Sequence, residues 1–459
     1  MSRQLILLCG AAVLGPAAAA WGQEAPEDTQ ALRAQIDRLR ERLDALERGV
    51  AAPIAPALGP ASAVTGGGFP GSWRLPGSDT SMSFSGYAKA DSFFTFNAPS
   101  DAIGDSFVLS NIPLKGSAAN SQGGDYRMHS RQSRIRFDTD TPTDWGRLQT
   151  RIEGDFFGRN NDQQSTTSFS FRMHQAFARL GPVLAGQVAS TFEDDDTEPE
   201  MIDNFGAAGD SDVRQAMVRY TAQFDAGFHL DAAFENPFAS VATPTGAAIT
   251  ISPNMIDRMP DTILRLRYKG TWGAVNASGV MRYFEYDDGV GGTASAVGGG
   301  GHLGAHAKLW DKDMIGFNFN GGPGLGRYIQ TTNTSPETNA VCPGNPNTAF
   351  TPGCPVDLTV NTVYGGWLQY THYWADNWHS NAIYGYMHAD IPVAQLGAGA
   401  NGLSRNIQST AVNLIWNPVP KVMFGLEYMA GWRYVARAAP GTQDYGTASR
   451  LQLGMRYGF

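Results

Sequence analysis

The most regular pattern in this chain is the alternation of apolar and polar side chains along short stretches. The last ten residues, RLQLGMRYGF, show it clearly, because Leu451, Leu453, Met455, Tyr457 and Phe459 share one face of an extended strand. Arginine, glutamine and glycine occupy the other face. Chain ends normally fray, so alternation that continues to the last residue predicts a terminal strand paired on both edges.

Similar stretches recur from residue 83 onward, about sixteen in all, and the connections between them alternate between short and long. The short ones lie at 140–144, 181–182, 225–226, 270–272, 311–312, 375–377 and 417–420. The long ones lie at 97–124, 158–167, 193–211, 237–259, 287–300, 321–360, 390–403 and 437–446. Outer-membrane barrels have this rhythm because one rim is periplasmic and the other extracellular. We therefore predict an all-β fold, a 16-stranded antiparallel transmembrane β-barrel, with less regular alternation at 273–284 and 378–388.

The cost of placing arginine against lipid, roughly 2–4 kcal/mol at the bilayer midplane, fixes which face of each strand points inward. In 147–156, Arg151 and Glu153 share the polar face, whereas Leu148 and Ile152 share the apolar one. The pattern predicts a polar lumen and a water-filled channel rather than a packed core. Tryptophans at strand ends are expected to form an interfacial girdle. They are Trp310, Trp374, Trp378 and Trp416.

The N-terminal part has a different pattern. Residues 1–22 are expected to be a secretory signal peptide, with Arg3 before an apolar run and Ala20-Trp21-Gly22 at the cleavage site. Residues 23–50 are expected to form a periplasmic coiled coil, because the apolar residues in 27–50 are spaced alternately four and three residues apart, as in a heptad repeat. These residues are Leu32, Ile36, Leu39, Leu43, Leu46 and Val50. A flexible linker is expected at 51–80, followed by the barrel at 81–459.

Composition narrows the class of protein. The chain has 459 residues and a net charge of -9, which argues against nucleic-acid binding. After the signal no apolar stretch is long enough for a membrane-spanning helix. Cys342 and Cys354 lie in a Pro/Gly-rich loop, and in an oxidising compartment they are expected to form a disulfide. A metal pair is the weaker alternative, because no histidine lies inside that loop.

Basic residues at inward positions are the main candidates for function. One interpretation is an electropositive constriction that attracts anions through guanidinium contacts. The alternative is that the arginines only neutralise lumen acids such as Glu153 and Asp155. The candidate pore-lining residues are Arg134, Arg136, Arg151, Arg172, Arg219, Arg265, Arg267 and Glu153.

The third long loop, STFEDDDTEPEMIDNFG at 190–206, is rich in acids. Folded into the barrel, its acids Glu193, Asp194, Asp195 and Asp196 would face the arginines and produce a transverse field. The alternatives are a solvated acidic loop and a calcium site, although the acids are not at EF-hand spacing.

No motif for catalysis is present, since the sequence lacks G-x-S-x-G, H-E-x-x-H and a glycine-rich phosphate loop. We expect no enzyme activity, no cofactor and no metal. His174 and His379 are expected to be pore or interface residues.

Several strings resemble the DcaP-like trimeric outer-membrane porin family. They are SGYAKADSFF, RMHSRQSRIRFDTDTPTDWGRLQTRIEGDFFG, FRMHQAFARLGPVLAGQVASTFED and the Arg-Gln-Ala-x-Val-Arg-Tyr stretch at 214–220. The resemblance covers nearly the whole chain and is looser from 237 to 350. It implies a homotrimer of sixteen-stranded barrels with a periplasmic coiled coil, Arg134, Arg136, Arg151 and Arg172 in the pore, and Glu193 to Asp196 in the constriction loop.

We therefore expect a passive porin in the outer membrane of a Gram-negative cell, in contact with lipid and selective for small anionic solutes such as dicarboxylates. The terminal Phe459 resembles the signal read by the outer-membrane assembly machinery. Two alternatives remain open: a phosphate-selective porin, and a structural envelope protein that contacts peptidoglycan through its coiled coil.

Overall fold

The chain divides into two compact units, residues 1–63 and 64–459. The computed structural model describes residues 34, 36–40, 65–97, 105–158, 161–162, 168–248, 252–330, 335–343, 350 and 354–459. In the first unit, residue 34 and residues 36–40 are helical. The expected signal peptide and the rest of the expected coiled coil lie outside the described residues.

The second unit is a closed barrel. Its described residues form sixteen antiparallel strands when β3 and β4, which both pair with β2, are counted as one interrupted strand. The predicted fold class is therefore confirmed. The barrel strands are β2 (Ser81–Asn97), β3 (Asp125–His129), β4 (Arg134–Thr143), β5 (Gly146–Asp155), β8 (Arg172–Leu180), β9 (Val183–Ala189), β10 (Arg214–Gln223), β11 (Phe228–Glu235), β14 (Asp261–Gly270), β15 (Gly273–Asp287), β16 (Thr293–Lys308), β17 (Met314–Pro323), β20 (Thr362–Ala375), β21 (Trp378–Ala389), β22 (Ser404–Trp416), β23 (Val422–Val435) and β24 (Tyr445–Gly458).

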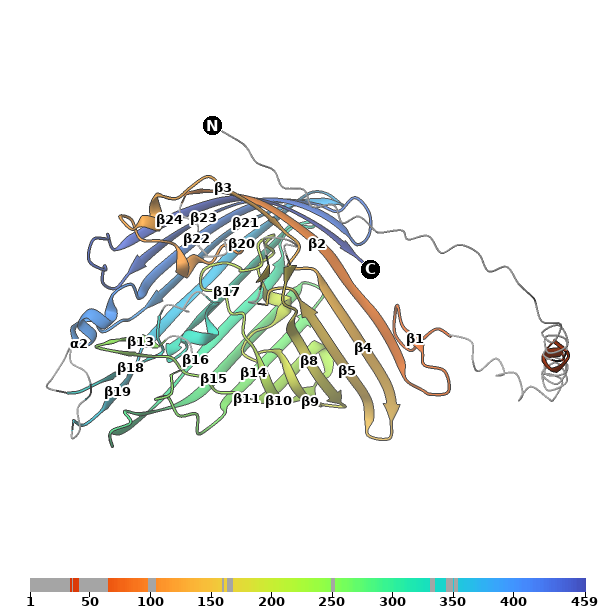
Figure 1. The fold of residues 1–459 in the computed structure, drawn as a ribbon, viewed down its shortest axis with the longest axis horizontal. Coiled ribbons are helices and arrows are strands. Elements are labelled where there is room, and N and C mark those ends of the chain that lie inside the picture. Colours follow the sequence, from red (N-terminus) through yellow and green to blue (C-terminus); the bar gives the residue numbers. More distant parts are fainter. Residues whose placement is uncertain are drawn as a thin grey trace, which may run out of the picture. The chain divides into compact units, whose positions relative to one another are not determined.

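The first and last barrel strands pair with each other, which leaves no free edge. Tyr87 of β2 pairs with Gly458, and Phe94 pairs with Leu451. Figure 1 shows β2 in orange beside the dark blue C-terminal strands. The ordered pattern at the chain end is thus explained by barrel closure, and Phe459 stacks on Phe84 at a ring-centroid distance of 5.9 Å.

The connections at one rim are short and those at the other rim are mostly long, as the sequence predicts. The expected long loop at 287–300 is wrong, because β15 runs to Asp287 and β16 begins at Thr293. The glycines at 298–301 suggested a loop, but they lie within a strand that a neighbouring chain segment approaches closely. A Cβ at Gly300 would lie 2.6 Å from the carbonyl oxygen of Gly321.

The remaining elements belong to the connections. β12 and β18 pair in parallel at the centre of a small four-stranded sheet, which two of the long connections form together. None of the described helices has the length and apolar character needed to cross a membrane. These elements are β1 (Trp73–Arg74), β6 (Asn161–Asp162), β7 (Ser168–Phe169), β12 (Val241–Thr243), β13 (Gly246–Ala248), β18 (Thr338–Val341), β19 (Asp357–Val360), α2 (Val393–Leu396) and the 3-10 helices η2 (Leu109–Asn111), η3 (Ala118–Ser121), η4 (Asp195–Thr197), η5 (Asp225–Gly227), η6 (Gly326–Tyr328) and η8 (Gly397–Ala400).

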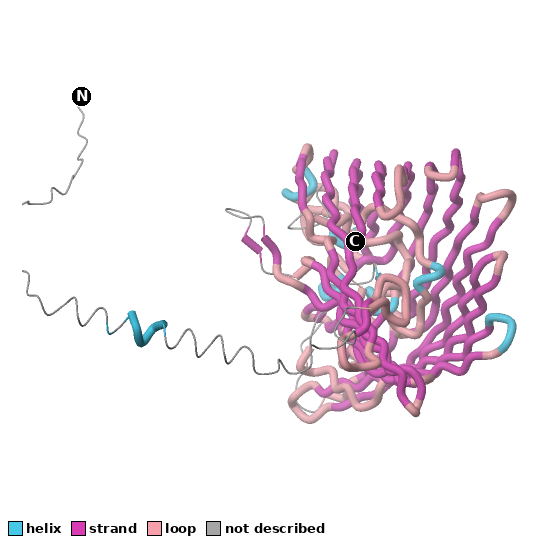
Figure 2. Tube along the Cα trace, turned by 90° about the vertical axis from the view of Figure 1, so that its right-hand side faces the viewer, coloured by secondary structure: helices cyan, strands magenta, loops and turns pink. Residues whose placement is uncertain are grey.

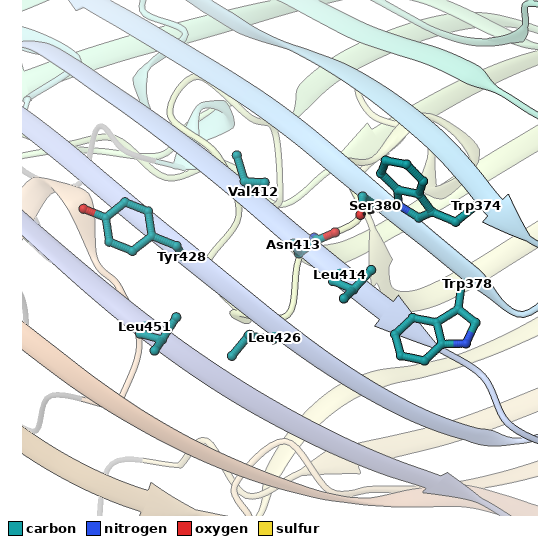
Figure 3. Close-up of a pocket in the computed structure, with 9 residues that line it drawn as sticks. All are labelled: Trp374, Trp378, Ser380, Val412, Asn413, Leu414, Leu426, Tyr428 and Leu451. Carbon is teal, nitrogen blue, oxygen red and sulfur yellow. Dashed lines mark hydrogen bonds between the residues drawn. The ribbon is translucent and has the colours of Figure 1, made fainter.

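The outer face of the wall is apolar, and aromatic residues gather at the short-turn rim. Trp378, Trp416 and Phe424 stack along this rim at centroid distances of 5.3 and 5.5 Å. Figure 2 shows the strands as a continuous wall. A groove of about 570 Å³ lies on β20 to β24. Figure 3 shows residues that line it, with Trp374 and Trp378 at one end and Tyr428 and Leu451 at the other. These positions fit the predicted girdle and lipid-facing surface.

Part of the lumen is packed, which the sequence did not predict, because inward-folded connections build an apolar cluster there. Phe107 and Ile112 from the first long connection, Phe192 from the third and Leu325 after β17 pack in one cluster of buried side chains. Strand residues such as Met387 join the same cluster. Packing of the connections against one another buries apolar surface that open loops would expose to water, which explains the difference.

Candidate functional site

The lumen wall on β4, β5 and β8 carries the predicted arginines. The strand register places Arg134 opposite Asp155, and Asp155 opposite Arg172. Nη2 of Arg172 lies 2.7 Å from Oδ2 of Asp155, and Nη1 of Arg134 lies 3.3 Å from Oε1 of Glu153. The ring of His174 also contacts Glu153, and its Nδ1 lies 2.7 Å from the same Glu153 oxygen. The wall therefore alternates bases with acids and is not an unbroken row of like charges.

Arg136 and Arg151 lie apart from this group. Both bond Asp138, and the Nε of Arg151 donates to Oδ1 of Asp138 at 2.8 Å. With Phe69 and Phe177 they line a separate cavity of about 200 Å³. The predicted arginine wall is thus divided into two clusters. Phe69 belongs to residues 65–80, which we expected to lie in the linker.

The acidic loop between β9 and β10 lies inside the barrel. The backbone N–H groups of Ile202 and Asp203 each donate to Glu427 on β23 at 3.0 Å. The Nζ of Lys89 on β2 donates to the carbonyl oxygen of Ile202 at 2.7 Å. The N–H of Ala208 donates to the Oγ of Ser409 on β22 at 2.9 Å. Because β22 and β23 lie far from β9 and β10 in the strand order, the loop crosses the lumen.

A cavity of about 300 Å³ lies where this loop faces the barrel wall. The wall contributes Arg134, Arg214 and Arg456. Nη2 of Arg214 lies 2.7 Å from Oδ1 of Asp212 in the loop. Within the described part of the chain Arg456 has no acidic partner and instead lies with its guanidinium 5.5 Å from the ring centroid of Tyr87. The loop contributes Glu198, Pro199, Met201, Asp203, Asn204, Phe205, Gly206, Asp210 and Asp212, and Tyr87, Gln132 and Gln330 complete the lining.

Burial alters the charge that the loop presents to this cavity. It raises the pKa of Asp210 to about 7, and the neighbouring Asp212 carboxylate acts in the same direction. Near neutral pH the loop therefore carries less negative charge than its sequence suggests, while the wall arginines stay charged.

The four acids that the sequence singled out, Glu193 to Asp196, do not line this cavity. Glu193 is buried and accepts a hydrogen bond from the N–H of Val213 at 3.2 Å. Oδ2 of Asp194 lies 3.6 Å from Arg267, and Oδ1 of Asp196 lies 2.6 Å from Lys269, both on β14. The acids that share a cavity with Arg134 are those from Glu198 onward.

The other predicted pore-lining residues lie farther around the wall. Arg265 and Arg267 donate to Asp231 on β11 at 2.9 and 3.1 Å. Arg219 is inward and buried on β10. These residues form a second group that does not line the cavity of Arg134.

Sequence reasoning did not single out five of the charged residues at the cavity, which are Asp203, Asp210, Asp212, Arg214 and Arg456. Arg456 was placed on the polar face of the terminal strand, so its orientation was predictable but its neighbours were not. Arg214 begins one of the strings shared with the family, and nothing in its spacing indicated a role. Asp210 and Asp212 lie after the acidic run, and their position depends on how the loop returns across the lumen.

Cys342 and Cys354 are joined by a disulfide with an S–S distance of 2.04 Å. Among the described residues, no group of three or more His, Cys, Asp or Glu side chains is placed to hold a metal ion.

The chain resembles known outer-membrane proteins. The family model described as DcaP outer membrane protein matches residues 26–459. The crystal structure of the outer membrane channel DcaP of Acinetobacter baumannii aligns with a TM-score of 0.67 and 17% identity, over 86% of this chain and 100% of that chain. OmpT, an outer membrane protein of Vibrio cholerae, aligns with a TM-score of 0.50 and 12% identity, over 83% of this chain and 98% of that chain. No curated protein sequence matches the chain.

Proposed function

Because the chain belongs to the DcaP outer membrane protein family, we propose that it is a passive channel for small anionic solutes such as dicarboxylates. Its porin-like barrel lies in the outer membrane. We propose further that three copies assemble as a homotrimer, and that the N-terminal helix lies in the periplasm and supports this assembly. The proposed route runs through the lumen, past the cavity between the wall arginines and the inward loop.

The observation that carries the proposal is the arginine-lined cavity of the lumen. Arg134 and Arg456 face a loop in which burial raises the pKa of Asp210 to about 7, so that this carboxyl is only partly ionised near neutral pH. A guanidinium presents a planar fork of donors that matches a carboxylate. Low-dielectric walls focus the field of such groups and raise the local concentration of anions.

Arg456→Gln tests the proposal with little structural cost, because no carboxylate loses a salt-bridge partner among the described residues. We expect the chloride-to-potassium permeability ratio to fall by roughly two- to fivefold, since one unit charge at about 4 Å is worth about 1 kcal/mol in water. The measurement is the reversal potential of the purified, refolded full chain in a planar bilayer under a KCl gradient.

Arg437→Gln is the matched control, because Arg437 is exposed in the connection between β23 and β24. It removes the same charge outside the cavity and should leave the ratio unchanged. A cation-selective wild-type channel, or a ratio that Arg456→Gln does not alter, would contradict the proposal. Current reduction by succinate compared with phosphate then separates a dicarboxylate preference from a phosphate preference.

A further inference from the structure

A second group of basic side chains gathers around Asp231, away from the cavity of Arg134. Asp231 is fully buried and accepts hydrogen bonds from the Nε atoms of Arg265 and Arg267. The Oγ1 of Thr221 donates to it at 2.6 Å. The strand register places Thr221 opposite Asp231, and Asp231 opposite Arg265, so these side chains share one inward-facing row.

Two further arginines belong to this group but form no salt bridge to any described acid, because Asp231 forms its salt bridges with Arg265 and Arg267. Arg219 is paired in register with Leu184, and Leu184 is paired with Arg179. The side chains of both arginines therefore extend from the same row of the wall. Arg219 is only 8% exposed. The Nε atoms of Arg219 and Arg179 are shielded from solvent and make no hydrogen bond to the described residues. Buried charges in proteins are normally paired, and these two guanidiniums have donor atoms that Asp231 does not bond.

The charges within this group are also unbalanced, with more guanidiniums than carboxylates. Four guanidiniums, those of Arg179, Arg219, Arg265 and Arg267, meet the carboxylates of Asp231 and Asp194. Among the described residues of this group, positive charges therefore exceed negative ones by two. Arg267 keeps 24% of its side chain exposed, so the group is open to the lumen on that side.

We propose that this group, which we call the Asp231 cluster, is a binding site for a divalent oxyanion. The ligand class is one whose two negative charges match the excess, either on one compact group such as sulfate or on two carboxylates. Arg219 and Arg179 supply the unpaired donors, and Asp231 holds Arg265 and Arg267 in place. The inference deepens the proposed function and rests on it only for the route by which the anion arrives.

Calorimetric titration of the detergent-purified full chain with sulfate tests the site without requiring conduction. We expect saturable binding to the wild type. Arg219→Gln should weaken it by about tenfold or more, because charge-assisted hydrogen bonds are about twice as strong as neutral ones. Arg437→Gln should bind as the wild type does. Absence of both sulfate and succinate binding to the wild type, or equal binding by Arg219→Gln, would overturn the inference.

Arg179→Gln provides a second variant in case Arg219→Gln does not fold. Arg179 is half-buried beside the end of β8, so its replacement disturbs little packing. It too should weaken sulfate binding. A parallel titration with succinate shows whether two linked carboxylates compete for the same site. The reversal potential of the same variants is measured separately. An anion-selective channel that binds neither sulfate nor succinate would defeat this inference and leave the proposed function standing.

Discussion

The arginines of this lumen occupy three kinds of surroundings, and these determine what each can do. Arg282 is 2% exposed and donates to Asp261 and Glu337, so it fixes the long connections to the wall. Arg134 shares its charge with Glu153 and Asp155. Arg456 is exposed and has no acidic partner within the described chain. The last kind forms no salt bridge among the described residues, so it offers more of its charge to a passing solute than the other two kinds.

The titration of Asp210 should make the selectivity of the channel depend on pH. Its pKa is raised to about 7 although the indole of Trp367 and the amide of Asn318 donate to it at 2.8 and 3.1 Å. As the pH falls from 8 to 6 the carboxylate becomes protonated and the cavity loses a negative charge. The chloride-to-potassium permeability ratio should therefore rise, by roughly fivefold at most. Reversal potentials in bilayers between pH 5 and 8 measure the change.

Asp210→Asn is the control for this titration, because it keeps an acceptor for Trp367 and removes the charge. The variant should have at pH 8 the selectivity that the wild type shows at pH 6. The stability of the fold should also depend on the titration of Asp210. Because its folded-state pKa lies above its usual 3.8, the protonated carboxyl favours folding at low pH. That contribution is lost as the pH rises through about 7. A wild-type ratio that is flat across this range would contradict the assignment.

Among the elements, β21 shows why the alternation at 378–388 is difficult to interpret from the sequence. His379 and Asn381 face inward in the polar part of the lumen, and His379 bonds Glu200 of the loop at 3.0 Å. Farther along the same inward row, Ile383 and Met387 join the apolar cluster made with the loops. The inward face therefore changes from polar to apolar along one strand. That change depends on which connections fold back, and strand periodicity alone carries no information about it.

Glycines in β16 offer a test at the scale of one strand. A Cβ at Gly300 would lie 2.6 Å from the carbonyl oxygen of Gly321 and 3.1 Å from Leu325, so the ladder or the loop must shift. At Gly301 the nearest atom would lie at an ordinary 3.6 Å. We expect Gly300→Ala to lower the free energy of unfolding by about 1–3 kcal/mol, as overpacking does, and Gly301→Ala to change it little. Guanidinium unfolding of both variants in micelles provides the comparison.

Equal stability of these two variants would show that β17 and the connection after it do not pack tightly against Gly300 of β16. The same contact explains the mistaken loop at 287–300. In isolation, four consecutive glycines favour a loop, because glycine weakens a strand. In the barrel they leave room for Leu325 and for Pro323, whose carbonyl oxygen would lie 2.7 Å from a Cβ at Gly298.

At the scale of the whole molecule, the sequence predicts the barrel well because one rule governs every strand. Lipid outside and water inside require apolar and polar residues to alternate, and the alternation is visible without any tertiary contact. The candidate site was predicted less completely. The faces of Arg134, Arg151 and Arg172 followed from periodicity, but their partners, and the acids opposite them, depend on a loop that contacts strands more than 200 residues away, as Ile202 and Glu427 show.

The lipid-facing surface can be tested by two substitutions on one strand. Leu453 and Tyr457 both point outward on β24, 45% and 58% exposed, and Tyr457 lies close to the short-turn rim. At a tilt near 45°, four residues place Leu453 roughly 9 Å deeper in the hydrocarbon. Leu453→Arg should therefore cost about 2–4 kcal/mol on folding into lipid vesicles, and Tyr457→Arg only about 0–1 kcal/mol. Equilibrium refolding into synthetic vesicles measures both values without the cellular assembly machinery. Equal costs would mean that β24 does not cross the bilayer as its outward residues indicate, because only depth distinguishes the two positions.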